Sequence, residues 1–167
     1  TIDKPITVCY YYPKNFNQNT CVLMVLPGAG RNADDYRDAW IESAEKHNIL
    51  VLSLSYPEKK YPYESYHLAG IVKDLDMRKG IFFKKGTNQV HVDENQMNFT
   101  LNKHTNTWIF QDFDRVFSLV KEATGITQNK YDMFGHSAGG QILHRMVLLH
   151  PFSKANRIIA ANSGSYT

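Results

Sequence analysis

At residues 135–140 the chain reads Gly-His-Ser-Ala-Gly-Gly, which fits the Gly-x-Ser-x-Gly pattern of a serine on a sharp turn between a strand and a helix. Such a serine has a strained backbone, and the bends around it leave no room for a Cβ two residues before or after it. The half-apolar residues 130–134 predict the strand. Residues 138–149 contain no proline and place apolar side chains at helical spacing, so they predict a helix, which Pro151 ends.

The composition is typical of a globular protein of one domain, with 167 residues, 43% hydrophobic and 21% charged, and a net charge of +3. Lys and Arg are scattered along the chain, which gives no indication of a nucleic-acid partner. The longest apolar run, residues 21–27, has the length of a strand and is too short for a membrane span. Cys9 and Cys21 are too few for a disulfide scaffold, and their apolar surroundings predict two buried thiols.

Strands and helices alternate along the rest of the chain. Strands are expected at residues 6–12, 21–26, 49–55 and 157–161, the second, third and fourth of them buried, and helices at residues 32–47 and 108–123. Asn32 is the expected N-cap of the first helix, and Gly125 is expected to end the second. Asp112 and Asp114 are expected on the solvent face of the second helix. The alternation predicts an α/β fold with a mostly parallel sheet.

Residues 58–107 lack a sustained period and are expected to form an insertion. Within them, residues 89–92 and 98–101 have strand-like composition and are expected to pair as a small hairpin. A segment of this length is too long for a plain connector and is often functional.

A serine nucleophile needs a base for its proton and donors for the oxyanion. Two backbone N–H groups are expected to be the donors, one of them from Ala138, the residue after the serine. The other is expected in the loop of residues 27–31, Pro-Gly-Ala-Gly-Arg, which follows a buried strand and precedes a capped helix. Ala29 is the best-placed donor in that loop.

Residues 28–38, Gly-Ala-Gly-Arg-Asn-Ala-Asp-Asp-Tyr-Arg-Asp, together with residues 135–141, resemble the α/β-hydrolases of polyhydroxybutyrate-depolymerase-like or feruloyl-esterase-like type. The resemblance spans about residues 22–167. It implies an α/β-hydrolase fold with helices on both faces of the sheet, and a secreted or periplasmic serine esterase. It makes Ser137 the nucleophile, and Ala29 and Ala138 the oxyanion donors. Relatives commonly have His where this chain has Pro27, so the loop lacks that histidine's support.

In the family the catalytic acid and then the histidine follow the nucleophile, on loops after two further strands. This chain has no Asp, Glu or His after His150. We therefore expect residues 1–167 to be a partial α/β-hydrolase domain that lacks the last strands, with an insertion at about 58–107. Such a fragment has an unpaired sheet edge, needs the remaining C-terminal segment of the hydrolase, and is inactive or nearly so alone.

The candidate substrate-binding residues are Tyr66 and His67 in the insertion, with Ser163 and Tyr166 after the last strand, because ligands of open parallel sheets gather at the carboxyl ends of the strands. For Tyr66 and His67 ordinary packing is the alternative. The leading hypothesis is an esterase acting on a small-molecule or polymeric ester. The alternatives are a serine peptidase of the same fold and a non-catalytic binding domain. No metal or cofactor is predicted.

Overall fold

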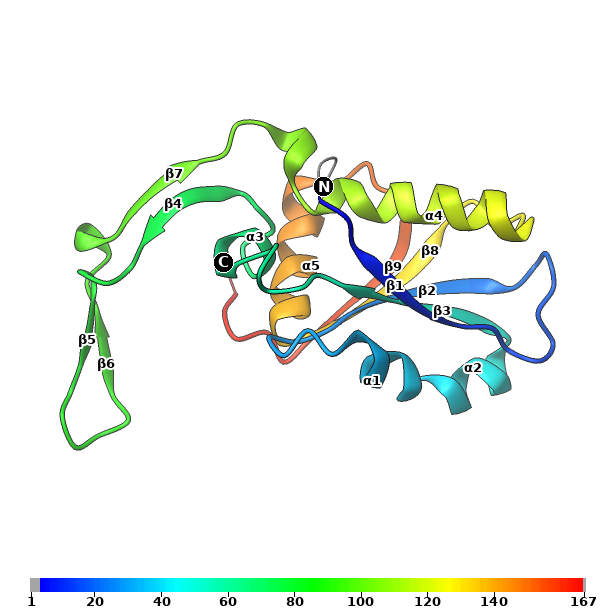
Figure 1. Cartoon of the computed structure of the whole chain (residues 1–167), viewed down its shortest axis with the longest axis horizontal. Helices are drawn as coiled ribbons and strands as arrows, with labels where there is room; N and C mark the ends of the chain where they lie inside the picture. The colour runs from blue at the N-terminus through cyan, green and yellow to red at the C-terminus, as the bar shows by residue number, and fades with distance from the viewer. Residues whose placement is uncertain (1–3, 167) are drawn as a thin grey trace.

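The computed structural model describes residues 4–166, so residues 1–3 and 167, the ends of the predicted domain, lie outside the described part. The centre is a five-stranded sheet in the order β1-β3-β2-β8-β9, in which β1 is antiparallel to β3 and the other pairs are parallel (Figure 1). The strands are β1 (Thr7–Tyr11), β2 (Cys21–Leu26), β3 (Ile49–Ser55), β8 (Tyr131–His136) and β9 (Ala155–Ala161). The expectation of a mostly parallel sheet is confirmed.

Helices cover both faces of this sheet (Figure 1). α1 (Ala33–Asp38) and α2 (Ile41–His47) lie on one face, and α4 (Phe110–Thr124) and α5 (Ala138–Leu149) lie on the other. β2 alternates between the two layers: Met24 and Leu26 belong to the large apolar cluster with α4 and α5, whereas Val25 belongs to a smaller cluster with Ala44 of α2. The central strand is therefore buried on both faces, as its continuous apolar run predicts.

The first predicted helix is interrupted. Residues 32–47 form two short helices, and the break lies at Trp40, whose ring packs edge-on against Phe134 of β8 at a centroid distance of 5.3 Å. A tight turn from Trp40 N to Arg37 O ends the first of them. Asn32 is the N-cap residue, but its side chain donates to the Asp35 carboxylate and makes no capping bond to the backbone.

Helix α4 ends at Gly125, whose φ of 72° is left-handed, as predicted. The expectation that Asp112 and Asp114 face solvent is wrong for Asp112, and Asp114 is half-buried. Asp112 is buried and accepts a long hydrogen bond from Tyr56, and Asp114 accepts one from the Tyr131 hydroxyl at 2.7 Å. These two tyrosines reach the helix from the sheet layer, and nothing in the period of the helix itself reveals them.

Two further expectations of burial are wrong. Cys9 is half-buried and Cys21 is exposed, and both thiols are free. Cys21 is the first residue of β2, where the strand emerges from the layers. The second expectation is that of a buried strand at residues 157–161. These residues belong to β9, an edge strand with no neighbouring strand on one side among the described residues, and 56% of Ile159 is exposed.

The segment between β3 and α4 packs on the body through α3, and its strands β4 to β7 form an arm that projects from the body (Figure 1). The elements of this segment are α3 (Tyr63–Tyr66), β4 (Val72–Asp76), β5 (Ile81–Phe83), β6 (Val90–Val92), β7 (Asn98–Leu101) and the 3-10 turns Glu94–Gln96 and Thr105–Thr107. The expected pairing of residues 89–92 with 98–101 is wrong. β6 pairs with β5, and β7 pairs with β4, so each of the two strands has a partner earlier in the chain. No helix among residues 4–166 is long and apolar enough to cross a membrane.

Close packing between α5 and β2 gives a test of the fold. A Cβ at Gly139 would overlap the carbonyl of Leu26, and neither backbone can move away easily. We expect Gly139→Ala to lower the free energy of unfolding by about 2–3 kcal/mol. Gly30→Ala is the matched control, because its Cβ would meet only the flexible side chain of Asn32. Equal urea midpoints for the two variants would contradict this packing.

Candidate active site

Ser137 lies between β8 and α5 in a conformation that non-glycine residues rarely adopt. Its φ is 54° and its ψ is −113°. The Ser137 N–H donates to Ala161 O of β9 at 2.9 Å, and Gln141 N–H donates to Ser137 O at 3.0 Å. The neighbouring strand and the first helical turn therefore hold the strained residue in place. The strand, turn and helix occur in the predicted order, with the helix at the predicted residues 138–149.

The glycines around the serine are required by space. A Cβ at Gly135 would overlap the carbonyl of Gly139, and a Cβ at Gly140 would lie 2.6 Å from Ser163 Oγ. Together with the contact of Gly139 on Leu26, these approaches bring the first turn of α5 onto the ends of β2, β8 and β9.

The loop after β2 lies beside Ser137. Leu26 and Gly135 are partners in the parallel pairing of β2 with β8, so both strands end at the same level. An ideal Cβ on Gly28 would lie 3.4 Å from Ser137 Cβ. A turn from Arg31 N to Gly28 O folds the loop back and leaves Ala29 exposed at its tip. Ala138 is the first residue of α5, where helix geometry leaves the N–H without a partner in the helix.

Contacts of Tyr66 and Arg31 stabilise the loop after β2. Tyr66 is fully buried, and its hydroxyl donates to Pro27 O at 2.7 Å. The Arg31 guanidinium stacks on the Tyr66 ring at 3.9 Å and donates to the carbonyls of Tyr56 and Tyr61 at 2.7 and 2.9 Å. Burial lowers the pKa of Arg31. These contacts tie the loop to the residues that follow β3. Sequence reasoning missed them, although an arginine directly after Gly-Ala-Gly was a usable signal.

Arg145 fixes the segment that carries His67. It is buried on α5 and donates to His67 O at 3.1 Å and to Gln141 O at 3.0 Å. The His67 ring stacks on Tyr63 at 4.4 Å. Burial, and then the nearby Arg31, lower the pKa of His67. Tyr66 thus packs against the loop after β2, and Arg145 ties the neighbouring His67 to α5. Their contact with substrate stays a prediction.

Ser163 and Tyr166 lie at different levels of α5. Ser163 Oγ is buried next to Gly140, and it has no hydrogen-bond partner in the described part of the chain. Tyr166 is exposed and stacks on His144 at 5.4 Å, two helical turns beyond Ser137. Ser163 therefore lies against the first turn of α5, which follows Ser137, whereas Tyr166 lies further along that helix, and their contact with substrate stays a prediction.

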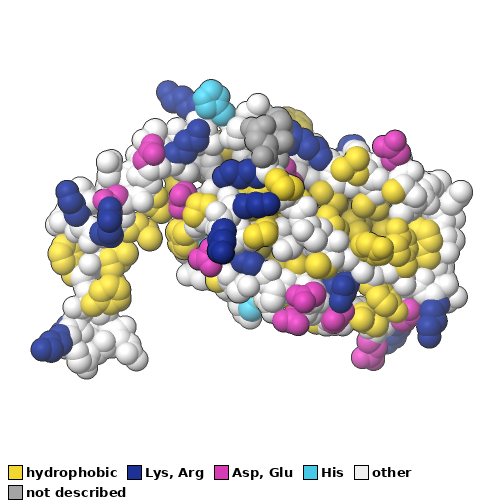
Figure 2. All heavy atoms as spheres, in the orientation of Figure 1, with side chains coloured by type: hydrophobic (Ala, Val, Ile, Leu, Met, Phe, Trp, Pro, Cys, Tyr) yellow, Lys and Arg dark blue, Asp and Glu magenta, His cyan; other side chains and the backbone are white. Residues whose placement is uncertain are grey.

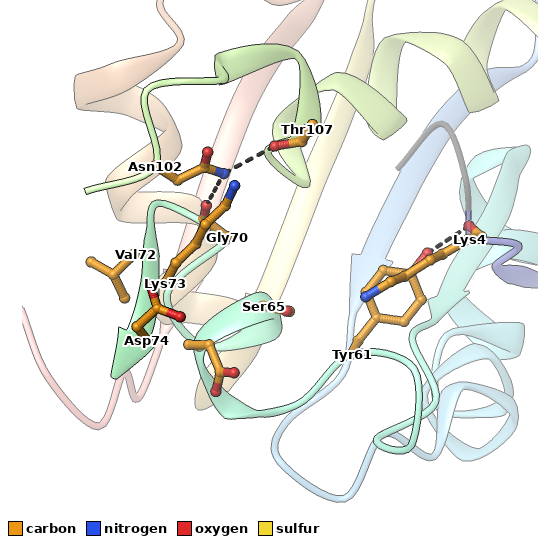
Figure 3. A pocket seen from close by; sticks show the side chains of 10 residues that line it. Lys4, Tyr61, Ser65, Gly70, Val72, Lys73, Asp74, Asn102 and Thr107 are labelled. Atoms are coloured by element: carbon orange, nitrogen blue, oxygen red, sulfur yellow. Dashed lines mark hydrogen bonds between the residues drawn. The ribbon is translucent and has the colours of Figure 1, made fainter. Parts of the chain in front are cut away.

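A cavity of about 410 Å³ lies at the base of the arm (Figure 3). Ser65, Lys73 and Asn102 are among its lining residues, and Asn102 is tied to Gly70 O and Thr107 Oγ1. Ser137 and the predicted substrate-binding residues do not line it. The cavity belongs to the junction of arm and body and not to the Ser137 region.

Within residues 4–166 no histidine or carboxylate is hydrogen-bonded to the Ser137 hydroxyl. His136, the residue before it, has its Nδ1 2.7 Å from the Tyr36 hydroxyl. The described residues also contain no group of three or more His, Cys, Asp or Glu placed to hold a metal ion. The described site therefore consists of a strained serine beside the loop of Gly28, and the role of the Ala29 and Ala138 N–H groups as oxyanion donors stays a prediction.

The mostly parallel sheet, the helices on both faces and the strained serine between β8 and α5 define the chain as an α/β-hydrolase. It is 35% identical to poly(aspartic acid) hydrolase-1 from Sphingomonas sp. KT-1, with a TM-score of 0.76 over 98% of this chain and 53% of that one. It is 28% identical to LpqC, a poly(3-hydroxybutyrate) depolymerase from Bordetella parapertussis, with a TM-score of 0.77 over 99% of this chain and 50% of that one.

A more distant structure, an acetyl xylan esterase from Aspergillus awamori, shares the fold at 12% identity and a TM-score of 0.61, over 95% of this chain and 47% of that one. The chain therefore spans about half the length of the solved structures that it matches. No protein-family model and no curated protein sequence matches it.

The Tyr66 hydroxyl can be tested by its removal. Tyr66→Phe leaves Pro27 O buried without its donor, so we expect the free energy of unfolding to fall by about 1–2 kcal/mol. Tyr63→Phe, on the exposed side of the same short helix, is the control and should change it by less than about 0.5 kcal/mol. The support of the loop by Tyr66 is refuted if urea unfolding gives the two variants the same stability.

The lowered pKa of His67 predicts a pH dependence. As the pH falls through the ordinary value of 6.5, the unfolded chain takes up a proton that the folded chain resists. Stability is therefore lost as the pH falls below 6.5, and His67→Gln should lose less of it between pH 7 and pH 5 than the wild type. His47→Gln, at an exposed position, should retain the wild-type slope. Thermal unfolding across this range measures the three slopes, and a His67→Gln slope as steep as that of the wild type contradicts the prediction.

Proposed function

We propose that the protein is a serine hydrolase that cleaves carboxylic esters through an acyl-enzyme on Ser137. The observation that carries the proposal is the left-handed backbone of Ser137 at the start of α5, next to the loop of Gly28. A serine is held in such strain where the fold has to present its hydroxyl at the carboxyl edge of the sheet. The similarity of the chain to the poly(3-hydroxybutyrate) depolymerase structure supports the same class of chemistry.

In the proposed reaction the Ser137 hydroxyl loses its proton to a base and attacks the ester carbonyl. The N–H groups of Ala29 and Ala138 donate to the oxyanion that forms, and loss of one such donor typically lowers the rate about 10²–10³-fold. The alcohol leaves with a proton returned by the base. Water then hydrolyses the acyl-enzyme by the same steps and releases the acid.

We propose that the base and the acid come from a C-terminal segment of the hydrolase beyond residue 166. Three observations support this. The described residues offer Ser137 no hydrogen-bonded histidine or carboxylate. β9 presents an open edge that further parallel strands could join. The chain also spans about half of the structures that it matches. In this view residues 1–167 are part of one hydrolase domain, residues 58–107 are its insertion, and residues 1–167 alone are inactive or nearly so.

The proposed substrates are small-molecule or polymeric esters. The poly(3-hydroxybutyrate) depolymerase at 28% identity favours a hydroxyalkanoate ester, whereas the feruloyl type rests on the sequence motifs alone. A second candidate is the hydrolysis of amide bonds, as in the predicted peptidase, because the poly(aspartic acid) hydrolase is 35% identical. A secreted or periplasmic location is implied by the resemblance and stays a prediction.

Covalent labelling tests the nucleophile. We expect a fluorophosphonate to label Ser137 in the full-length polypeptide, and Ser137→Ala to abolish the label and lower ester hydrolysis by at least about 10⁴-fold. Ser118→Ala, on α4, is the matched control and should keep both label and activity.

The same experiment separates the alternatives. Turnover of oligo-aspartate that is lost in Ser137→Ala, with no turnover of hydroxybutyrate esters by the wild type, would support the amide reaction over the ester reaction. Unchanged hydrolysis in Ser137→Ala would exclude Ser137 as the nucleophile. Absence of label, together with no hydrolysis of either substrate by the wild type, would sink both reactions and leave a non-catalytic binding domain.

A further inference from the structure

The hairpin of β5 and β6 at the end of the arm has one wholly apolar face. Its register pairs Ile81 with Val92 and Phe83 with Val90. Residues two apart on a strand share a face, so these four side chains lie together on one side of the hairpin. Phe83 is 80% exposed, and Val90 and Val92 are about half exposed.

Basic residues flank this face without acidic ones among them. Residues 79–92 contain three lysines, Lys79, Lys84 and Lys85, and no Asp or Glu. Lys84 and Lys85 lie at the turn of the hairpin. Two backbone hydrogen bonds close this turn, one from Lys84 N to Gln89 O and one from Thr87 N to Lys84 O. Figure 2 shows hydrophobic side chains over the end of the arm, with Lys and Arg beyond them at its tip.

The base of the hairpin is fixed. Asp93 N donates to Gly80 O at 2.8 Å, and a Cβ on Gly80 would lie 2.7 Å from Asp93 O and from Met97 Cγ. The hairpin therefore presents its face in a set shape, clear of the sheet and its helices (Figure 1).

A two-stranded hairpin has no layer of its own to cover such a face, and no other part of the described chain covers it. The exposed apolar area is on the order of 300 Å², whereas a stable protein interface needs about 800 Å² from each partner. A second copy of the chain is therefore a poor fit. A small apolar face flanked by lysines fits a surface that is apolar inside and negatively charged outside, because the phenyl ring enters the acyl region while the ammonium groups meet the headgroups.

We propose that the β5–β6 hairpin docks the protein on an anionic lipid surface, with Phe83 and the two valines inserted and Lys84 and Lys85 on the headgroups. This docking is peripheral and reversible. It does not depend on the catalytic proposal.

Vesicle sedimentation with the whole polypeptide tests this proposal. Binding to equimolar phosphatidylglycerol and phosphatidylcholine vesicles is expected to be at least about tenfold stronger than binding to phosphatidylcholine alone, and to weaken in high salt. Phe83→Ala should lower the binding constant about tenfold. Lys84→Gln with Lys85→Gln should lower it about 30-fold.

Two controls match these variants in exposure. Phe152→Ala removes a phenyl ring that is 94% exposed elsewhere on the molecule, and Lys59→Gln with Lys60→Gln removes another adjacent exposed pair. Both should bind as the wild type does. Equal binding to the two kinds of vesicle, no binding to either, or equal losses in hairpin and control variants would overturn the proposal. A dimer in sedimentation velocity that Phe83→Ala dissolves would assign the face to a second copy and would also overturn it.

Discussion

The contact of the first turn of α5 with the end of β2 is the constraint on which the rest of the structure depends. Gly139 packs so closely on the carbonyl of Leu26 that no side chain fits between them. This approach needs β2 and β8 to be parallel neighbours that end at one level, which the pairing of Leu26 with Gly135 provides. It also forces the chain to turn sharply between β8 and α5, and the strain of that turn falls on Ser137.

The loop after β2 follows from the same arrangement. Since β2 ends beside β8, Gly28 comes so close to Ser137 that a Cβ built on it would lie in van der Waals contact with Ser137 Cβ. A glycine-rich loop has little stiffness of its own, and here Tyr66 and Arg31 supply it through buried contacts from a segment far along the chain. The segment between β3 and α4 thus does two things: Tyr66 of α3 supports the loop beside Ser137, and the distal hairpin of the arm presents an apolar face to the surroundings.

Local patterns in the sequence predict the parts that local physics decides. The helix of residues 138–149, the end of α4 at Gly125 and the two-sided burial of β2 all follow from spacing and turn chemistry. The failures have long-range causes. Burial of Asp112 depends on a hydroxyl from Tyr56, and the strand pairing within the arm depends on partners that periodicity does not encode. The serine and its loop were predictable from two motifs, whereas the support by Tyr66 needed the three-dimensional fold.

The central claim is that the amides of Ala29 and Ala138 are placed to hold an oxyanion formed at Ser137. A crystal structure of the full-length polypeptide after reaction with a phosphonate ester tests it most directly. We predict a phosphorus bond to Ser137 Oγ and a phosphonyl oxygen at about 2.7–3.1 Å from both amide nitrogens. An adduct on another residue, or a phosphonyl oxygen that points away from both amides, would contradict the account.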